Sequence, residues 1–241
     1  VVPLSFVEQN SGRVTRGHRF LTQCPEGSIE GVEITLNHAS DYEQALEKAH
    51  VVVSTAKRRA TIEAALTPFH KQHYSGLISE VVQLVEQPHP MVCSFDPKYL
   101  DLPEQVLIQT MVKHQKYFPL FKASALSSDF LVVADNVTPQ NKATIQSGNV
   151  RVLSARLEDA RFFYEEDLKL PLSQNVDKLD SVLFQEGLGS LKDKLSRIGK
   201  LAKTFNQLFN CQVNEALIDE TLSYLKSDLV SLMVYEFPSL Q

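Results

Sequence analysis

The sequence predicts an α+β fold, with strands and helices mixed over residues 1–150 and helices alone after them. In the first part, short alternating or apolar runs are typical of strands: GVEITL (31–36), MVCSF (91–95) and FLVVADNV (130–137). After Gly148, apolar side chains recur at the spacing of amphipathic helices. A chain of 241 residues can hold one large domain or two small ones. We expect a mixed domain at 1–150, a helical linker at 151–182 and the start of a helical domain at 183–241.

The first part carries helix signals between its predicted strands. Ser40 followed by Glu43 is a capping box, which predicts a helix from about Asp41 to Ala49. Three further helices are predicted, at 54–73, at 75–87 before Pro88 and at 102–115 with Pro103 in its first turn. The run at 13–21 reads as a strand or a strand followed by a turn. KYFPLF (116–121) alternates like a strand, and 130–137 is its expected partner.

The second part reads as helical throughout. Helical periodicity of the apolar residues covers four segments: 149–170, 171–184, 190–209 and 214–237. In the third of these, Leu195, Ile198, Leu201 and Phe205 fall on the expected buried face. No internal repeat or low-complexity tract interrupts the pattern.

Composition limits the classes of function. The formal net charge is −5, so binding to a nucleic acid would have to use local basic patches. The three cysteines, Cys24, Cys93 and Cys211, are isolated, which favours reduced thiols in the cytoplasm. No apolar run approaches the ~20 residues of a membrane span. Because the chain lacks an initiator methionine and stops just after a helical pattern, we expect a fragment of a longer protein.

The stretch MVKHQKYFPLF (111–121) crowds cations and aromatic rings together. A helix that ends near His114 and a strand that starts at Lys116 would place Tyr117 and Phe118 on opposite faces. One ring would then be buried, and the other would be free to stack on a base beside the two cations. The alternative is a structural corner between a helix and a strand.

Two further clusters are rich in cations. The run GRVTRGHRF holds three arginines within seven positions, namely Arg13, Arg16 and Arg19. The second cluster is Lys57, Arg58 and Arg59, in the first turn of a predicted helix, where the helix dipole disfavours positive charge. Such a placement favours an anionic partner. The alternative for both clusters is a solvated surface.

Signals for metal binding or catalysis are weak. His70 and His73 are three residues apart on a predicted helix, a spacing that can chelate a metal. No carboxylate or cysteine at a suitable spacing supports them. The sequence also lacks a phosphate-binding loop, a dinucleotide-binding motif, a nucleophile elbow and an HExxH motif. We therefore predict no catalytic residue, no metal and no cofactor within this chain.

Six ordered stretches resemble one family, the β subunit of the bacterial heterotetrameric glycyl-tRNA synthetase. They are SGRVTRGHRFL, DYEQALEKAHVVVSTAKRRATI, LPEQVLIQTMVKHQKYFPLF, GNVRVLSARLEDARFFYEEDLKLPL, FQEGLGSLKDKLSRI and KSDLVSLMVYEFPSLQ. The resemblance implies an internal portion of a β subunit, or of a fused αβ chain. It implies a B3/B4-like module at 1–150, followed by an HD-like helical domain. It also implies that the α subunit makes glycyl-adenylate with ATP and Mg²⁺, and that the β subunit contributes tRNA binding.

The HD comparison exposes a departure from that family pattern. A working HD phosphohydrolase holds its metal with a His-Asp pair, and the nearest counterpart here is Ser227-Asp228. Residues 115–241 contain no histidine, although neutral imidazole is the usual ligand in such a site. We expect a scaffold that has lost its metal. The B3/B4 comparison invites an editing role, but a pocket for glycine can exclude larger amino acids by size, so we expect tRNA contact instead.

The resemblance and the clusters together give the leading hypothesis, a non-catalytic part of glycine–tRNA ligase that contacts the acceptor side of glycine tRNA. The expected RNA-binding residues are Arg13, Arg16, Arg19, Lys57, Arg58, Arg59, His114, Lys116 and Tyr117. The expected partners are glycine tRNA and the α subunit, with no DNA and no membrane. Two alternatives stay open: a scaffold that docks the α subunit, and a metal-dependent HD phosphohydrolase.

Overall fold

The computed structural model describes residues 2, 4–7, 9–22, 30–69 and 74–240, so Cys24, His70 and His73 lie outside the described residues. The chain forms two compact units. The first comprises Val1–Leu100 and Thr110–Ala155, and the second comprises Asp101–Gln109 and Arg156–Gln241.

Strands and helices occur together, which confirms the α+β class. The domain boundaries predicted at 150 and 182, and the likeness to B3/B4 and HD modules, stay predictions. Among the described helices, none is long and apolar enough to cross a membrane.

The first unit begins with two small antiparallel pairs. Strand β1 (Ser5–Phe6) pairs with β2 (Gln9–Asn10). Strand β3 (Val14–Arg16) pairs with β4 (Glu33–Thr35), with Val14 opposite Thr35 and Arg16 opposite Glu33. The predicted strands at 13–21 and 31–36 are therefore confirmed, although β3 gives way to a turn after Arg16.

Two predicted helices follow close to their expected limits. A 3₁₀ turn, η1 (Ala39–Asp41), leads into α1 (Tyr42–Lys48). The capping box is made by His38 and Asp41 at η1, and Ser40 with Glu43 does not form it. Helix α2 (Thr55–Leu66) lies within the predicted range, and the side chain of Ser54 caps it by accepting a hydrogen bond from the Lys57 amide. The 3₁₀ turn η2 (Thr67–Phe69) follows α2, and helix α3 (Ser75–Val81) ends several residues before Pro88.

A three-stranded antiparallel sheet forms the centre of the first unit. Its order is β5–β7–β6, with β5 at His89–Ser94, β6 at Phe118–Lys122 and β7 at Ala125–Ala134. The predicted strands at 91–95, 116–121 and 130–137 overlap these three elements, each with its limits shifted by a few residues. In β7, Leu131 pairs with Val92 of β5 and with Phe118 of β6, which places β7 at the centre of the sheet.

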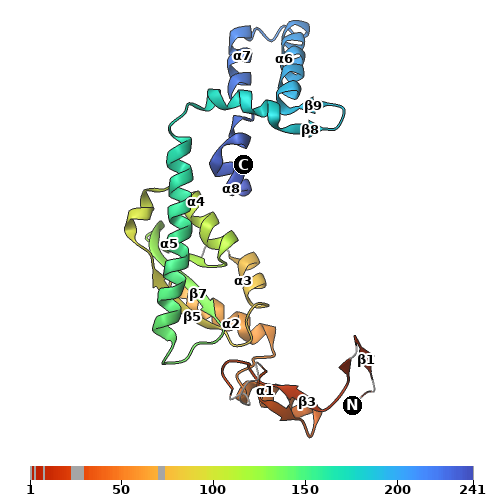
Figure 1. Cartoon of the computed structure of the whole chain (residues 1–241), viewed down its shortest axis with the longest axis vertical. Coiled ribbons are helices and arrows are strands. Elements are labelled where there is room, and N and C mark those ends of the chain that lie inside the picture. The colour runs from red at the N-terminus through yellow and green to blue at the C-terminus, as the bar shows by residue number, and fades with distance from the viewer. Residues whose placement is uncertain (1, 3, 8, 23–29, 70–73, 241) are drawn as a thin grey trace. The chain divides into compact units, whose positions relative to one another are not determined.

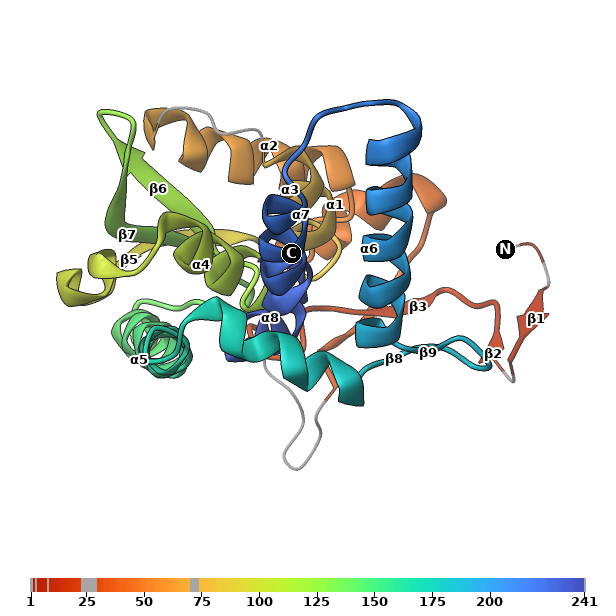
Figure 2. The same ribbon diagram turned by 90° about the horizontal axis from the view of Figure 1, so that it is seen from above.

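Helices cover both faces of this sheet (Figures 1 and 2). On one face, a cluster of buried side chains joins α2, α3 and the turn after α3 to the sheet. The helices and the turn contribute Ile62, Leu77, Ile78, Val81 and Val82, and the sheet contributes Phe118, Leu120 and Leu131. On the other face, the ring of Phe130 stacks on Tyr117 with the ring centroids 5.1 Å apart. The hydroxyl of Tyr117 donates to Asn149 Oδ1 of α5 (Lys142–Asp167) over 2.6 Å. Helix α5 begins earlier than predicted and runs through Gly148.

The predicted helix at 102–115 changes its winding partway. The 3₁₀ turn η3 (Pro97–Asp101) precedes α4 (Glu104–Gln109), and a π-helical turn, η4 (Thr110–His114), follows it. Val106, Leu107 and Met111 are buried, as their apolar spacing predicts. The π-helical turn leads directly to the corner before β6.

The second unit is mostly helical, with one hairpin. Its elements after α5 are η5 (Leu172–Ser181), β8 (Leu183–Gln185), β9 (Gly189–Ser190), α6 (Leu191–Leu208), α7 (Glu215–Tyr224), η6 (Ser227–Val230), α8 (Leu232–Glu236) and η7 (Pro238–Leu240). The expectation of helices alone is therefore wrong, because β8 and β9 form an antiparallel pair. Gly187 lies in their turn and Gly189 begins β9, both with φ of +78°, a conformation that favours glycine.

The predicted helix at 214–237 is wrong as a single element. Lys226 has a φ of 66°, which ends the helical path after α7 and separates it from η6 and α8. A carboxylate then begins the last α-helix: Asp167 accepts hydrogen bonds from the amides of Leu232 and Met233 over 2.9 and 2.8 Å. Negative charge at a helix N-terminus is favourable, so Asp167 fixes α8 against the end of α5.

Candidate nucleic-acid interface

Arg16, at the end of β3, and Arg13, just before it, differ in how far they are engaged within the protein. The guanidinium of Arg16 lies 2.9 Å from carboxylate oxygens of both Glu30 and Glu33. Arg13 donates to the carbonyl oxygen of Asn37 over 3.3 Å and has an exposed side chain. Ion pairs of this exposed kind contribute little to stability, but they reduce the charge that Arg16 offers to an anion.

The turn after β3 is closely held by backbone hydrogen bonds. The Gly17 amide donates to Val32 O and the His18 amide to Ala49 O, each over 2.9 Å. Thr22 donates to His18 O twice, from its amide over 3.1 Å and from its hydroxyl over 2.7 Å. A Cβ at Gly31 would lie 1.8 Å from Gly17 O, so only glycine permits this approach. The turn presents Arg19 and Phe20 at the surface.

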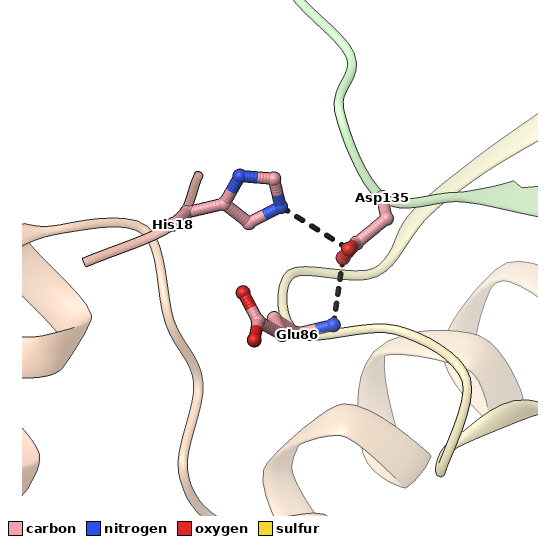
Figure 3. A group of neighbouring side chains, drawn as sticks. All are labelled: His18, Glu86 and Asp135. Atoms are coloured by element: carbon pink, nitrogen blue, oxygen red, sulfur yellow. Dashed lines mark hydrogen bonds and ion pairs between the residues drawn. The ribbon is translucent and has the colours of Figure 1, made fainter. Parts of the chain in front are cut away.

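The side chain of His18 is fully buried and holds the turn from inside. Its Nδ1 accepts hydrogen bonds from the amides of Phe20 and Leu21 over 3.1 and 3.2 Å, which assigns the ring hydrogen to Nε2. Nε2 lies 3.1 Å from Asp135 Oδ2, a close contact that does not meet the criteria for a hydrogen bond (Figure 3). Asp135 Oδ1 accepts from the amides of Glu86 and Gln87, each over 2.7 Å. His18 and Asp135 thus join the turn to the segments that flank β7 and β5.

His18, Glu86 and Asp135 also form a group that could hold a metal, since their ligand atoms lie within 4.8 Å of one another. Metal binding at Nε2 requires a lone pair there and, in the neutral ring, the hydrogen on Nδ1. Here Nδ1 faces two amide hydrogens, so that tautomer would lose both hydrogen bonds. We therefore interpret the group as a structural joint. No sequence motif indicated it, because its members come from three separate segments.

The three cations at the start of α2 have partners within the protein. Lys57 Nζ lies 2.9 Å from Glu47 and 3.0 Å from Glu43, and hydrogen bonds to Glu47 and then Glu43 raise the pKa of Lys57. Arg59 donates to Ser79 Oγ over 2.7 Å and pairs with Glu63 at 3.4 Å.

Arg58 has a different set of partners, which are backbone oxygens. It donates to Val82 O over 2.9 Å and to Val53 O over 3.0 Å, and it also donates to Val52 O. These contacts explain how α2 accommodates cations in its first turn without an external anion.

The HQKYF corner is more buried than the sequence suggested. The prediction that one of its two rings is exposed is wrong, because Tyr117 is 7% exposed and Phe118 is 0% exposed. Burial, with a smaller contribution from Cys93, raises the pKa of Tyr117 to about 12. Lys116 has a φ of 58°, and its Nζ lies 2.7 Å from Glu80. His114, at the end of the π-helical turn, is exposed.

The predicted RNA-binding residues differ in their partners inside the first unit. Carboxylates are the partners of Arg16, Lys57, Arg59 and Lys116, carbonyl oxygens those of Arg13 and Arg58, and aromatic rings those of Arg19 and Tyr117. The exposed side chains are Arg13, Arg16, Arg19, Lys57 and His114, and of these Arg16 and Lys57 are paired with carboxylates. Sequence reasoning missed Phe20, which is 64% exposed beside Arg19. RNA contact by any of these residues stays a prediction.

The counterpart of the HD metal pair is part of the packing of the second unit. Ser227 is fully buried, and its hydroxyl lies 3.4 Å from Ser223 O. Asp228 lies in η6, where its carbonyl accepts from the Ser231 hydroxyl over 2.7 Å. Residues 115–241 supply no imidazole, so nothing in this region favours a phosphohydrolase.

Comparison with known proteins identifies the family. The sequence profile described as "Glycyl-tRNA synthetase beta subunit" matches residues 1–241. The glycine–tRNA ligase β subunit of Myxococcus xanthus is 41% identical over 248 aligned residues, which cover 100% of this chain and 34% of that protein. Those of Listeria monocytogenes and Gloeothece citriformis are each 36% identical, with 100% of this chain and 35% of each relative covered. The chain spans about a third of the length of these curated relatives. The chain therefore belongs to the family of glycyl-tRNA synthetase β subunits, components of an aminoacyl-tRNA synthetase.

Proposed function

We propose that this chain contributes acceptor-side tRNA binding and scaffolding to glycine–tRNA ligase, for ATP-dependent charging of tRNA with glycine by the α subunit. The observation that supports the proposal is that Arg13 and Arg19 are both exposed on one segment, residues 13–21, which we call the β3 ribbon. The chain belongs to a family of tRNA synthetase subunits. Guanidinium groups bind phosphate by charge-assisted hydrogen bonds, and a fixed backbone reduces the entropy lost on binding. ATP and Mg²⁺ would be used by the α subunit, and no cofactor is assigned to these residues.

The test is the affinity of the full-length protein for glycine tRNA across a salt series. Each lost phosphate contact lowers the magnitude of the slope of log K against log salt by about 0.7–0.9, so Arg13→Glu with Arg19→Glu should lower it by roughly 1.4–1.8. A control with the same change in charge is Arg151→Glu with Arg156→Glu, on exposed positions of α5. If both double variants give the same slope and affinity, the β3 ribbon does not contact the RNA.

A second function, docking of the α subunit, is favoured by a separate observation. Helix α6 exposes Leu201 (57%), Phe205 (53%) and Leu208 (72%) on one face, although the periodicity predicted Leu201 and Phe205 to be buried. Phe209, 69% exposed, continues this face, and its ring stacks on Phe205 with the centroids 5.8 Å apart. Contiguous exposed apolar side chains of this kind mark interaction surfaces.

Docking at this face predicts a selective loss of association. Phe205→Ser with Phe209→Ser should weaken binding of the full-length protein to the α subunit by at least about tenfold, because aromatic anchors dominate interface energies. Leu84→Ser is the control, since Leu84 is 61% exposed but lies in the first unit. Unchanged association, measured by sedimentation or calorimetry, would exclude this face as the docking site.

A further inference from the structure

We propose that Phe20 is a stacking platform for an unpaired nucleobase of the bound RNA, with Arg19 beside it to meet the phosphate backbone. This inference rests on the proposed tRNA-binding function and deepens it by naming the element that takes a base. Neither the motifs of the sequence nor the family description assigns a role to Phe20. Three properties of the turn carry the inference: exposure of the ring, rigidity of its backbone and the chemistry of its neighbours.

The ring of Phe20 is exposed on the turn after β3. Phe20 is 64% exposed, as is Phe6 at 75%, whereas Phe118 and Phe130 in the same unit are 0% exposed. The guanidinium carbon of Arg19 lies 5.0 Å from the centroid of the Phe20 ring, within the range of a cation–π contact. In the free protein, the planar guanidinium of Arg19 can rest on the Phe20 ring. When RNA binds, a base can stack on the same ring in the same geometry.

The backbone that carries the ring is fixed before any ligand arrives. The amide of Phe20 is bonded to the buried Nδ1 of His18, and the amide of Leu21 is bonded to the same atom. His18 is in turn held at its own amide by Ala49 and lies close to Asp135 at Nε2. An exposed ring on a turn with this many hydrogen bonds loses little conformational freedom on binding, which raises affinity for a flat partner.

The neighbours of Phe20 favour a base over an apolar protein segment. Arg19 contacts the ring, Arg16 ends β3 before the turn, and Arg13 lies just before β3. Single-stranded nucleic acid is bound by this combination of aromatic faces with cations along the backbone. A docking helix would instead need contiguous apolar area, such as the exposed face of α6. The turn offers one exposed ring in contact with Arg19, while Arg16 nearby is paired with Glu30 and Glu33.

The test compares two substitutions at Phe20 in the full-length protein. Phe20→Leu keeps an apolar side chain but removes the aromatic face, and Phe20→Tyr keeps the face. We expect Phe20→Leu to weaken tRNA binding by about 5- to 150-fold, the equivalent of ~1–3 kcal/mol for one stacked base. Phe20→Tyr should stay within about twofold of the unsubstituted protein. Since the ring carries no charge, the salt dependence of binding should be the same in all three proteins.

Each outcome separates this inference from the function on which it rests. If the unsubstituted protein binds tRNA and Phe20→Leu binds equally well, the platform is wrong and the proposed function stands. If the unsubstituted protein shows no salt-sensitive tRNA binding, the proposed function fails and the platform fails with it. Loss of α-subunit association by Phe20→Leu, with tRNA affinity retained, would make Phe20 a protein contact and overturn the inference. Equal melting temperatures of the variants exclude a folding defect.

Discussion

Several side chains that look like ligand-binding groups in the sequence serve the protein's own backbone. Arg58 donates to carbonyls of the segment before α2 and of the turn after α3, and His18 accepts from two amides of its turn. Composition and spacing identify a cation or an imidazole but not its partner. Partners from distant segments, such as Asp135 for His18, become visible only in the folded chain.

Arg58 gives the first prediction at the scale of a residue. Replacing it by methionine keeps the apolar stem but leaves the carbonyls of Val52, Val53 and Val82 without this donor. Hydrogen bonds from charged groups contribute more than neutral ones, so the free energy of unfolding should fall by about 2 kcal/mol. Urea unfolding measures this change. Lys57→Met is the matched control and should have little effect, because its partners are exposed carboxylates.

Tyr117 gives the second prediction, on pH dependence. Its pKa is raised to about 12 in the folded state, so the unfolded chain releases this proton first as pH rises above about 10. The stability from the neutral phenol is complete below pH ~10 and is lost as pH approaches 12.

Between pH 9 and 11, the unsubstituted protein should lose about 1 kcal/mol more unfolding free energy than Tyr117→Phe, which lacks the titrating group. Urea unfolding at the two pH values tests this difference. Equal losses in the two proteins would show that Tyr117 ionises normally, contrary to its burial beside Phe130 and Asn149.

At the scale of elements, local signals in the sequence predicted much of the fold. The helical periodicity at 190–209 forms α6, and the apolar runs at β5 and β7 form strands. Two of the turns that separate elements carry no signal in the sequence. The β6–β7 hairpin turns at Ala123 and Ser124 with φ of 47° and 69°, without the Asn-Gly signal typical of such turns. The break at Lys226 is equally unmarked, because lysine is an ordinary helix former.

Gly148 gives a prediction for α5. It lies in the interior of this helix, and a Cβ built there meets no atom within 4 Å. Since alanine favours a helix over glycine, Gly148→Ala should raise the free energy of unfolding by about 1 kcal/mol. In α6, Gly199 is the contrast, because its Cβ would lie 2.6 Å from Leu222 Cδ1. Gly199→Ala should therefore gain less than Gly148→Ala, and a larger gain at Gly199 would contradict this account of both helices.

At the scale of the whole molecule, the sequence predicted the class and the family but only part of the candidate interface. The mixture of strands and helices follows from periodicity, and six ordered stretches carried the resemblance to the β-subunit family. The interface was harder to predict because a net charge of −5 leaves both signs across the surface. Some cations are paired with carboxylates from other elements, as Lys57 is with Glu47 and Lys116 is with Glu80. Such pairs are visible only in the folded chain.

The central claim is that this third of the β-subunit length touches tRNA, and ultraviolet cross-linking tests it most directly. The full-length protein would be irradiated with glycine tRNA, and the cross-linked peptides would be mapped by mass spectrometry, with excess unlabelled tRNA as the competitor. We predict competed cross-links within residues 13–21, where Arg13, Arg19 and Phe20 are exposed. Competed cross-links that all lie outside residues 1–241 would contradict the claim and would leave scaffolding as the role of this chain.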